Sequence, residues 1–512
     1  MYPGAHSLTC PDKPAVIHAT TGEVVTFAEL ETRSIRFAHW LIAAGLGRGD
    51  HIAVVADNDP TVYELYWGAL RCGLHITIVN NHLTPEEIGY IVDDCDATVL
   101  VVAAALADTV AGLREYTPQV EHRLAFGGPL AGYDDYRGAV AQFPATPPEQ
   151  QPRGALMLYS SGTTGRPKGI MRPLPDRDVA EPGDPLIGLL ERVYGVDTDT
   201  VYLSPAPVYH AAPLGYSASV QALGGTVVMM DRFDAEGALA AIEAHKVTHS
   251  QWVPTHFVRM LRLPADVRER YDRSSMRCAI HAAAPCPVEV KRAMIDWWGE
   301  IVVEYYSSTE GNGLTIIDSA EWLRKPGSVG RDGFIGTVHI CDDAGVELPP
   351  GEIGTVYFER TDSQFEYYKD PVKTAGTRHP VHPTWTAVGD LGHLDEDRFL
   401  FLSDRRSFLI ISGGVNIYPQ EVENCLAVHP VVRDVAVIGV PDPEMGESVK
   451  ALVQLESDVE PGPDLATELI DFTRSRIARY KSPRSIQFVT ELPRTPTGKL
   501  VKGAIAAAAA DA

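Results

Sequence analysis

The chain has 512 residues, a net charge of −24 and a hydrophobic content of 45%. This length is too great for one compact core, so two or more domains are expected. The negative field would repel a polyanion such as DNA, which excludes nucleic acid as a partner. Any anionic substrate must therefore be bound by hydrogen-bond donors at its own site and not attracted by the overall charge of the protein.

The 7 cysteines include no Cys-x-x-Cys pair. The odd number argues against a disulfide framework and a structural zinc site, and it favours a reducing cytosol, so we expect a cytoplasmic protein. The longest apolar run, residues 99–107, is about half of the roughly 20 residues that a membrane span needs. The N-terminus has no basic-then-apolar signal pattern. No integral membrane segment is expected.

Helical and strand patterns alternate in the first half of the chain. Residues 27–46 and 62–74 have helical spacing of apolar side chains, and residues 51–56 and 97–103 resemble short buried strands. This alternation predicts mostly parallel sheets covered by helices.

From about residue 325, glycine, proline and β-branched residues predict short antiparallel strands. An α/β pattern returns after residue 407. We therefore expect an α/β fold with a large N-terminal domain of α/β layers, residues 1–404, which includes a small β-rich subdomain at about 325–404. A hinge at 405–407 leads to a small mobile α+β C-terminal domain, residues 408–512.

An apolar strand within residues 155–169 runs directly into a loop of small polar residues. Glycines let the backbone approach a ligand closely, and backbone N–H groups, hydroxyls and a lysine form a nest for phosphate oxygens. The loop residues are Ser160, Ser161, Gly162, Thr163, Thr164, Gly165 and Lys168. Pro167 lies between Gly165 and Lys168, so the Walker pattern of P-loop NTPases does not fit. A polar surface turn is the alternative, and the stretch 172–185 that follows is expected to be a surface loop.

The segment YSSGTTGRPKG resembles the signature loop of the adenylate-forming superfamily, which includes acyl-CoA synthetases, nonribosomal adenylation domains and firefly-type luciferases. Further motifs follow in the family's order, and the resemblance spans nearly the whole chain. It implies an AMP-forming acid–thiol ligase. A carboxylic acid would react with ATP to give acyl-AMP and pyrophosphate, and coenzyme A would then take the acyl group and release AMP, with Mg²⁺ as the metal.

The segment EYYSSTEG resembles the family's Tyr-Gly-x-Thr-Glu motif. By that resemblance Tyr306 stacks on the adenine, Ser308 and Thr309 contact the nucleotide, and Glu310 holds Mg²⁺ together with Thr164. A π face suits a purine, and a hard carboxylate suits a hard cation. Thr164 and Glu310 are thus also expected to act in catalysis.

Two other segments complete the expected nucleotide site. Ala283 and Ala284 stand where the family has a Gly-rich segment over the other face of the adenine. Asp390 matches the residue that binds the ribose, because an ionised carboxylate can accept from two hydroxyl groups. By the same resemblance Arg405 reaches the ribose and phosphate.

The C-terminal part carries residues for both half-reactions. Lys499 matches the family's late lysine, which places a positive charge where negative charge builds in the transition state. Gly413 and Gly414 match the loop that lines the pantetheine tunnel. Family members rotate the small domain between the two steps. At the hinge, Ser407 replaces the usual aspartate or lysine.

The acid is expected to bind beside the nucleotide. His210 occupies a family position at the pocket mouth, where it could orient the carboxylate or gate the thiol; a partly buried histidine with satisfied hydrogen bonds is the alternative. By correspondence the pocket is lined by Tyr305, Ser307, Asn312 and Gly313, with Trp252 and His256 as further candidates. Ser307 replaces the usual glycine. The small Gly313 suggests room for a bulky acyl group, so we expect a fatty, aryl or alicyclic acid.

Two other functions stay open at this point. A free-standing adenylating enzyme could load a carrier-protein thiol, although no carrier domain is fused here. A nucleotide-binding sensor without catalysis is the alternative from another class, and the presence of both Glu310 and Lys499 argues against it. The expected partners are a small carboxylic acid, ATP and coenzyme A; a homodimer is left open.

Overall fold

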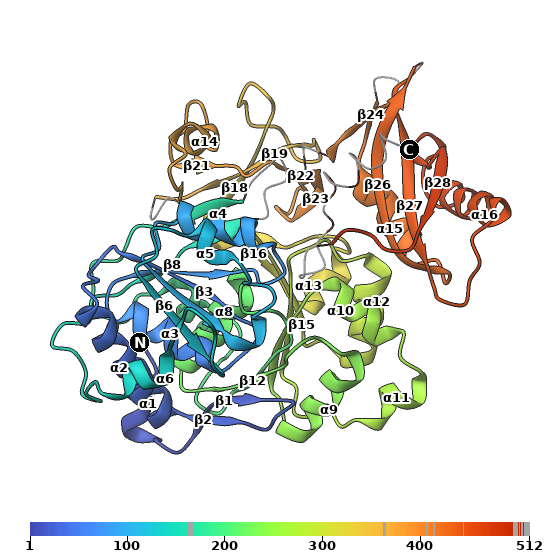
Figure 1. Ribbon diagram of the computed structural model, residues 1–512. Helices are drawn as coiled ribbons and strands as arrows, with labels where there is room; N and C mark the ends of the chain where they lie inside the picture. The colour runs from blue at the N-terminus through green and yellow to red at the C-terminus, as the bar shows by residue number, and fades with distance from the viewer. Residues whose placement is uncertain are drawn as a thin grey trace.

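The computed structural model describes residues 1–160, 167–361, 365–405, 408–412, 415–443 and 445–494, together with Leu500, Lys502 and Ile505. Figure 1 shows two large sheets with their helices, a smaller sheet above them, and a C-terminal sheet at the upper right. The mixed α/β architecture confirms the fold class that the sequence predicts.

The 6-stranded sheet has the order β7-β6-β5-β3-β4-β8 in the described part of the chain. Its strands are β3 (His51–Val55), β4 (His75–Val79), β5 (Val99–Ala103), β6 (His122–Phe126), β7 (Asp134–Asp135) and β8 (Ala155–Leu156). Along β3, Ile52 and Val54 face one hydrophobic cluster, whereas Ala53 and Val55 face another. Both faces are therefore buried, as in other parallel sheets. Helices α4 (Pro85–Asp94) and α5 (Leu113–Tyr116) contribute to the cluster that contains Ala53 and Val55.

The 9-stranded sheet has the order β17-β16-β15-β14-β13-β11-β12-β1-β2 among the described residues. Its strands are β1 (Pro14–His18), β2 (Val24–Thr26), β11 (Val201–Ser204), β12 (Thr226–Met229), β13 (His249–Trp252), β14 (Cys278–His281), β15 (Val302–Ser307), β16 (Leu314–Ile317) and β17 (Arg331–Ile335). The six strands from β15 to β1 in this order pair in parallel. At the two edges of the sheet, β2, β16 and β17 pair antiparallel. Helices α9 (Ala235–His245), α10 (Pro254–Leu261) and α12 (Val288–Trp298) pack on one face.

Helices α2 (Phe27–Ala43), α3 (Thr61–Leu70) and α8 (Ala211–Ala222) share one hydrophobic cluster with both large sheets. All 10 residues of α3 are buried, as expected for a helix packed on every side. The buried Glu64 carboxylate on α3 accepts from Arg33 at 3.1 Å and from Arg137 at 2.9 Å, which offsets its loss of water. The shorter peripheral helices are α1 (Gly4–Thr9), α6 (Tyr136–Ala141), α7 (Pro185–Arg192), α11 (Ala265–Arg270) and α13 (Ser319–Arg324).

The β-rich stretch divides between sheets. Strands β18 (Thr337–Cys341), β19 (Gly354–Glu359), β21 (Trp385–Thr386), β22 (Asp390–Leu394) and β23 (Leu400–Arg405) form a small antiparallel sheet. However, β17 pairs with β16 and extends the 9-stranded sheet. The prediction of one β-rich unit from residue 325 is therefore wrong for this first strand. Strands β9 (Leu158–Ser160), β10 (Lys168–Met171) and β20 (Glu366–Tyr367) form a further sheet, and α14 (Pro371–Gly376) follows it.

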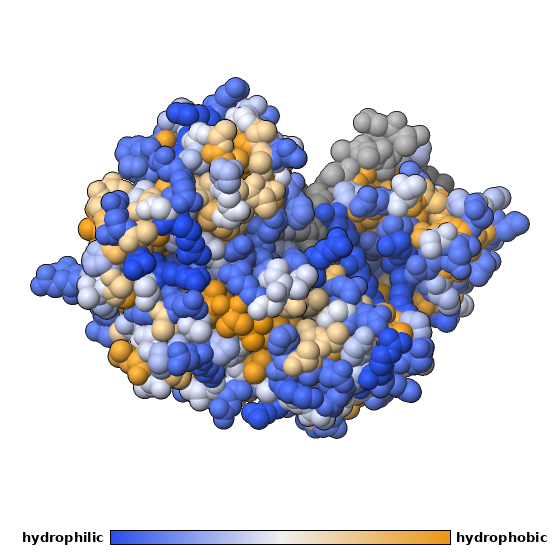
Figure 2. Space-filling view, turned by 60° about the horizontal axis from the view of Figure 1, so that its bottom comes forward, coloured by the Kyte–Doolittle hydropathy of each residue, from blue (hydrophilic) through white to orange (hydrophobic). Residues whose placement is uncertain are grey.

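The C-terminal sheet contains β24 (Ile410–Ser412), β25 (Val415–Ile417), β26 (Val432–Asp442), β27 (Gly446–Leu455) and β28 (Ser485–Val489). It has its own hydrophobic cluster with α15 (Pro419–Ala427) and α16 (Pro463–Arg474). Figure 2 shows this part as a lobe separated from the rest by a notch. Arg262 at the end of α10 bridges to the lobe, donating to the Val432 carbonyl at 2.6 Å. The boundary at 404–408 stays a prediction.

The described helices include none that is long and apolar enough to cross a membrane.

A buried ion pair fixes β15 against α12. The Lys291 ammonium lies 2.6 Å from the Glu304 carboxylate, and the side chains are 0% and 6% exposed. His281 lies opposite Glu304 on β14, and burial followed by the charge of Lys291 lowers its pKa well below the ordinary value. His281 is therefore neutral, and the pair balances its own charge. Because Glu304 precedes Tyr306 by two positions, the pair supports the strand that carries the expected adenine contact.

Replacing Glu304 by glutamine should leave the Lys291 ammonium buried without an opposite charge. We expect a loss of roughly 3–5 kcal/mol in the free energy of unfolding, measured with urea. The double variant Lys291→Met/Glu304→Leu removes both charges at similar volume and should recover most of that loss. A double variant as unstable as Glu304→Gln would contradict this account.

A stacked histidine pair predicts acid sensitivity. The rings of His51 and His75 lie 4.7 Å apart, and burial followed by the charge of His51 lowers the pKa of His75 to about 4. In the unfolded chain His75 titrates near about pH 6.5, so its contribution is complete above that pH and is lost as the pH falls toward about 4. Replacing His75 by glutamine should reduce the stability lost between about pH 7 and about pH 5 by about 2 kcal/mol. Urea unfolding at both pH values checks this, and an unchanged pH dependence would refute it.

Candidate nucleotide and acyl site

The expected nucleoside contacts meet where the large and small sheets join. Tyr306 on β15 donates its hydroxyl to the Asp390 carboxylate on β22 at 2.7 Å. Ala283 and Ala284 follow the carboxyl end of the neighbouring strand β14, and both are exposed. Ligands of parallel α/β sheets bind outside the carboxyl ends of the strands. The structure thus brings these predicted residues to one edge.

The backbone at Ala283 is strained. Its φ is 78°, in the left-handed region that glycine occupies more readily than alanine. This conformation explains why the resembled motif has glycine in this segment. An exposed, strained turn after a buried strand is typical of backbone that contacts a ligand.

Glu310 lies beside the hairpin of the predicted phosphate loop. Its carboxylate accepts from the Tyr367 hydroxyl at 2.7 Å, and Tyr367 belongs to β20, which pairs with β10. The Lys168 ammonium at the start of β10 lies 6.0 Å from the centre of the Tyr367 ring. Tyr367 therefore connects the expected metal ligand to the phosphate hairpin. Tyr367 cannot be found from the sequence, because nothing in its own segment marks the contact with Glu310.

The surroundings of Glu310 fit a magnesium ion that arrives with its nucleotide. The described residues contain no group of three or more His, Cys, Asp or Glu side chains able to hold a metal ion. Mg²⁺ is commonly held by one or two carboxylates together with substrate phosphates and water. A single carboxylate near the β9–β10 hairpin is compatible with that description.

Several predicted site residues lie outside the described residues. These are Ser161, Gly162, Thr163, Thr164, Gly165, Gly413, Gly414 and Lys499, and also the hinge residue Ser407. The backbones of Ser160 and Arg405 lie in β9 and β23, but their side chains are not described. Ser160 pairs with Lys168, so the two ends of the predicted phosphate loop are side by side. The roles of all these residues stay predictions.

The predicted acyl residues Tyr305 and Ser307 face away from Tyr306, because successive side chains of a strand alternate. Tyr305 is 9% exposed and belongs to the cluster between the large sheets. Its ring stacks on Tyr216 of α8 at 5.7 Å, and its hydroxyl accepts from Gln251 at 3.1 Å. Burial raises the pKa of Tyr305 to about 12, so the phenol stays protonated. This side of β15 is aromatic and uncharged.

Asn312 and Gly313 have packing roles. The Asn312 amide donates to the Thr386 carbonyl at 3.1 Å and accepts from Ser308 at 2.8 Å. A Cβ added at Gly313 would lie 1.9 Å from Phe358. Glycine is therefore required by close packing, and the inference that Gly313 leaves room for a bulky acyl group is wrong.

His210 precedes the first residue of α8, and its ring lies 4.5 Å from that of Tyr209. Trp252 is 1% exposed and lies in the cluster on the opposite face of the sheet from Tyr305. His256 stacks on Phe233 at 3.9 Å, and burial lowers its pKa to about 3. Trp252 and His256 are thus core residues and do not share a space with Tyr305, contrary to expectation.

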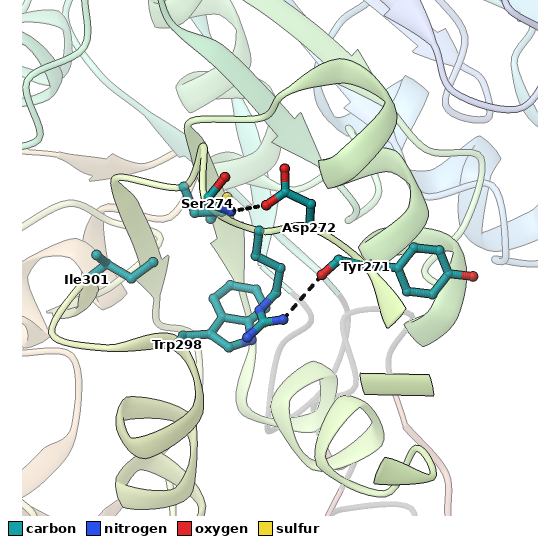
Figure 3. A pocket seen from close by; sticks show the side chains of 7 residues that line it. Tyr271, Asp272, Ser274, Trp298 and Ile301 are labelled. Atoms are coloured by element: carbon teal, nitrogen blue, oxygen red, sulfur yellow. Dashed lines mark hydrogen bonds between the residues drawn. The ribbon is translucent and has the colours of Figure 1, made fainter. Parts of the chain in front are cut away.

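A separate cavity of about 460 Å³ lies near the amino ends of β14 and β15 (Figure 3). In it Arg273 donates to the Tyr271 carbonyl at 3.4 Å, and the Ser274 amide donates to Asp272 at 2.9 Å. Because Tyr306 and Ala283 lie toward the opposite ends of these strands, this cavity is distinct from the candidate nucleotide site.

Comparison with known families matches most of the chain. Residues 5–368 match the AMP-binding enzyme family, and residues 421–499 match the AMP-binding enzyme C-terminal domain. A feruloyl-CoA synthase of an Amycolatopsis species is 33% identical over 98% of this chain and 97% of the relative. A long-chain-fatty-acid–CoA ligase of Bacillus subtilis is 29% identical over 96% of this chain and 91% of the relative.

Solved structures agree with these matches. The crystal structure of an anthranilate CoA ligase in complex with anthranoyl-AMP is 26% identical, with a TM-score of 0.85 over 99% of this chain and 96% of that chain. Both the sequence match and the fold therefore extend across the large and small parts. The chain belongs to the AMP-binding enzyme family, as the adenylate-forming motifs of its sequence imply.

Proposed function

We propose that the chain is an ATP-dependent acid:CoA ligase that acts on a hydrophobic fatty, aryl or alicyclic acid. The observation that carries the proposal is the meeting of Tyr306, Asp390 and Glu310 at one edge, beside the β9–β10 hairpin. The names of the relatives, which cover feruloyl, long-chain fatty and anthranilate substrates, support the class of acid.

In the first step the acid carboxylate attacks the α-phosphorus of ATP. A new oxygen–phosphorus bond forms, the bond to the bridging oxygen breaks, and pyrophosphate leaves with the electron pair. Tyr306 and Asp390 would hold the nucleoside, and Lys168 with the preceding loop would hold phosphates. Glu310 and Thr164 would hold Mg²⁺, which would neutralise phosphate charge. Lys499 supplies positive charge at the reacting oxygens. Positioning of this kind accounts for most of the rate in phosphoryl chemistry.

In the second step the thiol of coenzyme A attacks the acyl carbonyl. A carbon–sulfur bond forms, the carbon–oxygen bond to the phosphate breaks, AMP leaves with the electron pair, and the thiol proton passes to water. We assign to the loop with Gly413 and Gly414 the lining of the path by which the thiol approaches. This path would form after the C-terminal lobe rotates about residues 405–407. The aromatic side of β15, with Tyr305 against Tyr216, supports an apolar acyl group. A cytoplasmic location is part of the proposal, supported by the 7 free cysteines.

The activity is tested with ATP, Mg²⁺ and coenzyme A against hexadecanoate, ferulate, cyclohexanecarboxylate, acetate and an amino acid. We expect AMP and pyrophosphate in equal amounts with one of the first three acids, and an acyl-CoA product by mass spectrometry. ADP formation, or strict preference for acetate or the amino acid, would contradict the proposal. Acyl-AMP that forms without transfer to coenzyme A would point to a carrier-protein acceptor, and no acid-dependent product at all would favour a sensor.

Replacing Lys499 by alanine should lower the rate of adenylation by roughly 10²-fold or more, because a charge contact made in the transition state is lost. Transfer of a supplied acyl-AMP to coenzyme A should continue at the wild-type rate. Single-turnover assays of each half-reaction separate the two effects. Lys246→Ala, which removes a surface ion pair with Asp272, is the control and should change neither step. Equal loss of both steps in Lys499→Ala would refute the assignment.

A further inference from the structure

Cationic side chains gather around Glu310, although the chain as a whole carries a net charge of −24. The Lys168 and Lys373 ammonium groups lie 6.0 Å and 5.3 Å from the centre of the Tyr367 ring, whose hydroxyl donates to Glu310. Arg172 follows β10, and its guanidinium lies 3.5 Å from the Glu310 carbonyl. Three basic side chains therefore lie near the contact between Tyr367 and Glu310.

Arg172 and Arg360 both approach the peptide of Gly311. Arg360 donates to the Gly311 carbonyl at 2.7 Å. Gly311 has a φ of 62°, and a Cβ added there would lie 2.0 Å from the Arg172 guanidinium. Because Gly311 has no side chain, the Arg172 guanidinium can occupy the space beside it. Two guanidinium groups are brought to the loop that carries the expected metal ligand.

The contacts of Arg172 leave most of its donors available. Its contact with the Glu310 carbonyl is at the outer limit for a hydrogen bond, and a guanidinium has five N–H donors. No carboxylate of the described residues lies within salt-bridge distance of Arg172. A guanidinium with available N–H donors is suited to binding phosphate oxygens.

We propose that Arg172 and Arg360 form an anion site that receives the outer phosphates of ATP and then the departing pyrophosphate. The inference rests on the proposed function and adds residues that the phosphate loop does not include. Guanidinium groups bind phosphate oxygens through paired N–H donors. When the bond to the α-phosphorus breaks, the electron pair moves to a pyrophosphate oxygen, and the arginine pair meets that new charge.

The position beside Glu310 favours phosphate over a distant acidic group of the acid. The expected magnesium ligand and Lys168 of the predicted phosphate hairpin are linked through Tyr367. The expected acyl residue Tyr305 faces the other side, into the cluster between the large sheets. The arginine pair thus lies with the nucleotide residues.

The test uses Arg172→Leu, Arg172→Lys and the matched control Arg177→Leu. Arg177 lies in the same loop but donates to the Glu181 carbonyl at 3.1 Å and lies 3.9 Å from Asp184. We expect Arg172→Leu to raise both the KM for ATP and the inhibition constant of inorganic pyrophosphate by roughly tenfold or more, as for loss of a charged hydrogen bond. The KM for the acid should not change. Arg172→Lys should restore part of the effect, and Arg177→Leu should behave as wild type.

Unchanged pyrophosphate inhibition in a folded Arg172→Leu variant would overturn the inference, and so would a change confined to the KM of the acid. Thermal melting establishes that each variant is folded; if Arg172→Leu is not, Arg172→Lys and Arg172→Gln decide in the same assay. If the wild-type protein shows no acid-dependent exchange of pyrophosphate into ATP, the proposed function fails. Calorimetric binding of inorganic pyrophosphate with Mg²⁺ to wild type and Arg172→Leu then still tests the anion site, and equal affinities would overturn it.

Discussion

The hydrogen bond between Tyr306 and Asp390 joins the 9-stranded sheet to the small antiparallel sheet at 2.7 Å. The aromatic ring and the carboxylate that are proposed to hold one nucleoside come from these different sheets. Their relative position therefore depends on how the sheets pack. Phe358 of the small sheet lies 5.9 Å from the Tyr306 ring and presses on Gly313, while Lys291 and Glu304 support β15 from α12. The candidate site is stabilised by contacts that carry no chemistry themselves.

The distribution of basic side chains bears on how an acidic protein can bind anionic substrates. A chain with a net charge of −24 must attract ATP, a carboxylate and coenzyme A, all of which are anions. The described structure brings Lys168 and Lys373 to the Tyr367 ring, whose hydroxyl contacts Glu310. It brings Arg172 and Arg360 to the neighbouring carbonyls of Glu310 and Gly311. Such a local concentration acts over short distances, because salt screens the field of more distant acidic groups.

The sequence was sufficient for the elements whose pattern is local. The strands β3 and β5 and the helices α2 and α3 follow from apolar runs and helical spacing, because their buried faces are written into each segment. The sequence was insufficient where the structure of a segment depends on a residue or strand far away in the chain. The sheet that β17 joins depends on β16, and the need for glycine at 313 depends on Phe358.

The candidate site divides in the same way. Tyr306, Asp390 and Glu310 could be found because each lies in a motif of family order. Tyr367 and Arg172 could not, because their importance comes from contacts with Glu310, which is far along the chain. Trp252 was wrongly expected to lie near Tyr305. Because side chains alternate along β13, its neighbour Gln251 contacts Tyr305 instead. The roles of Lys499 and the glycines of the C-terminal lobe remain predictions.

The alternation of β15 has an evolutionary consequence. Its even-numbered positions, Glu304 and Tyr306, serve the ion pair and the proposed nucleotide side, and its odd-numbered positions, Tyr305 and Ser307, face the proposed acyl side. Selection can therefore exchange one set of side chains without disturbing the other. A change in acid preference would then require substitutions at positions 305 and 307 and none at positions 304 and 306.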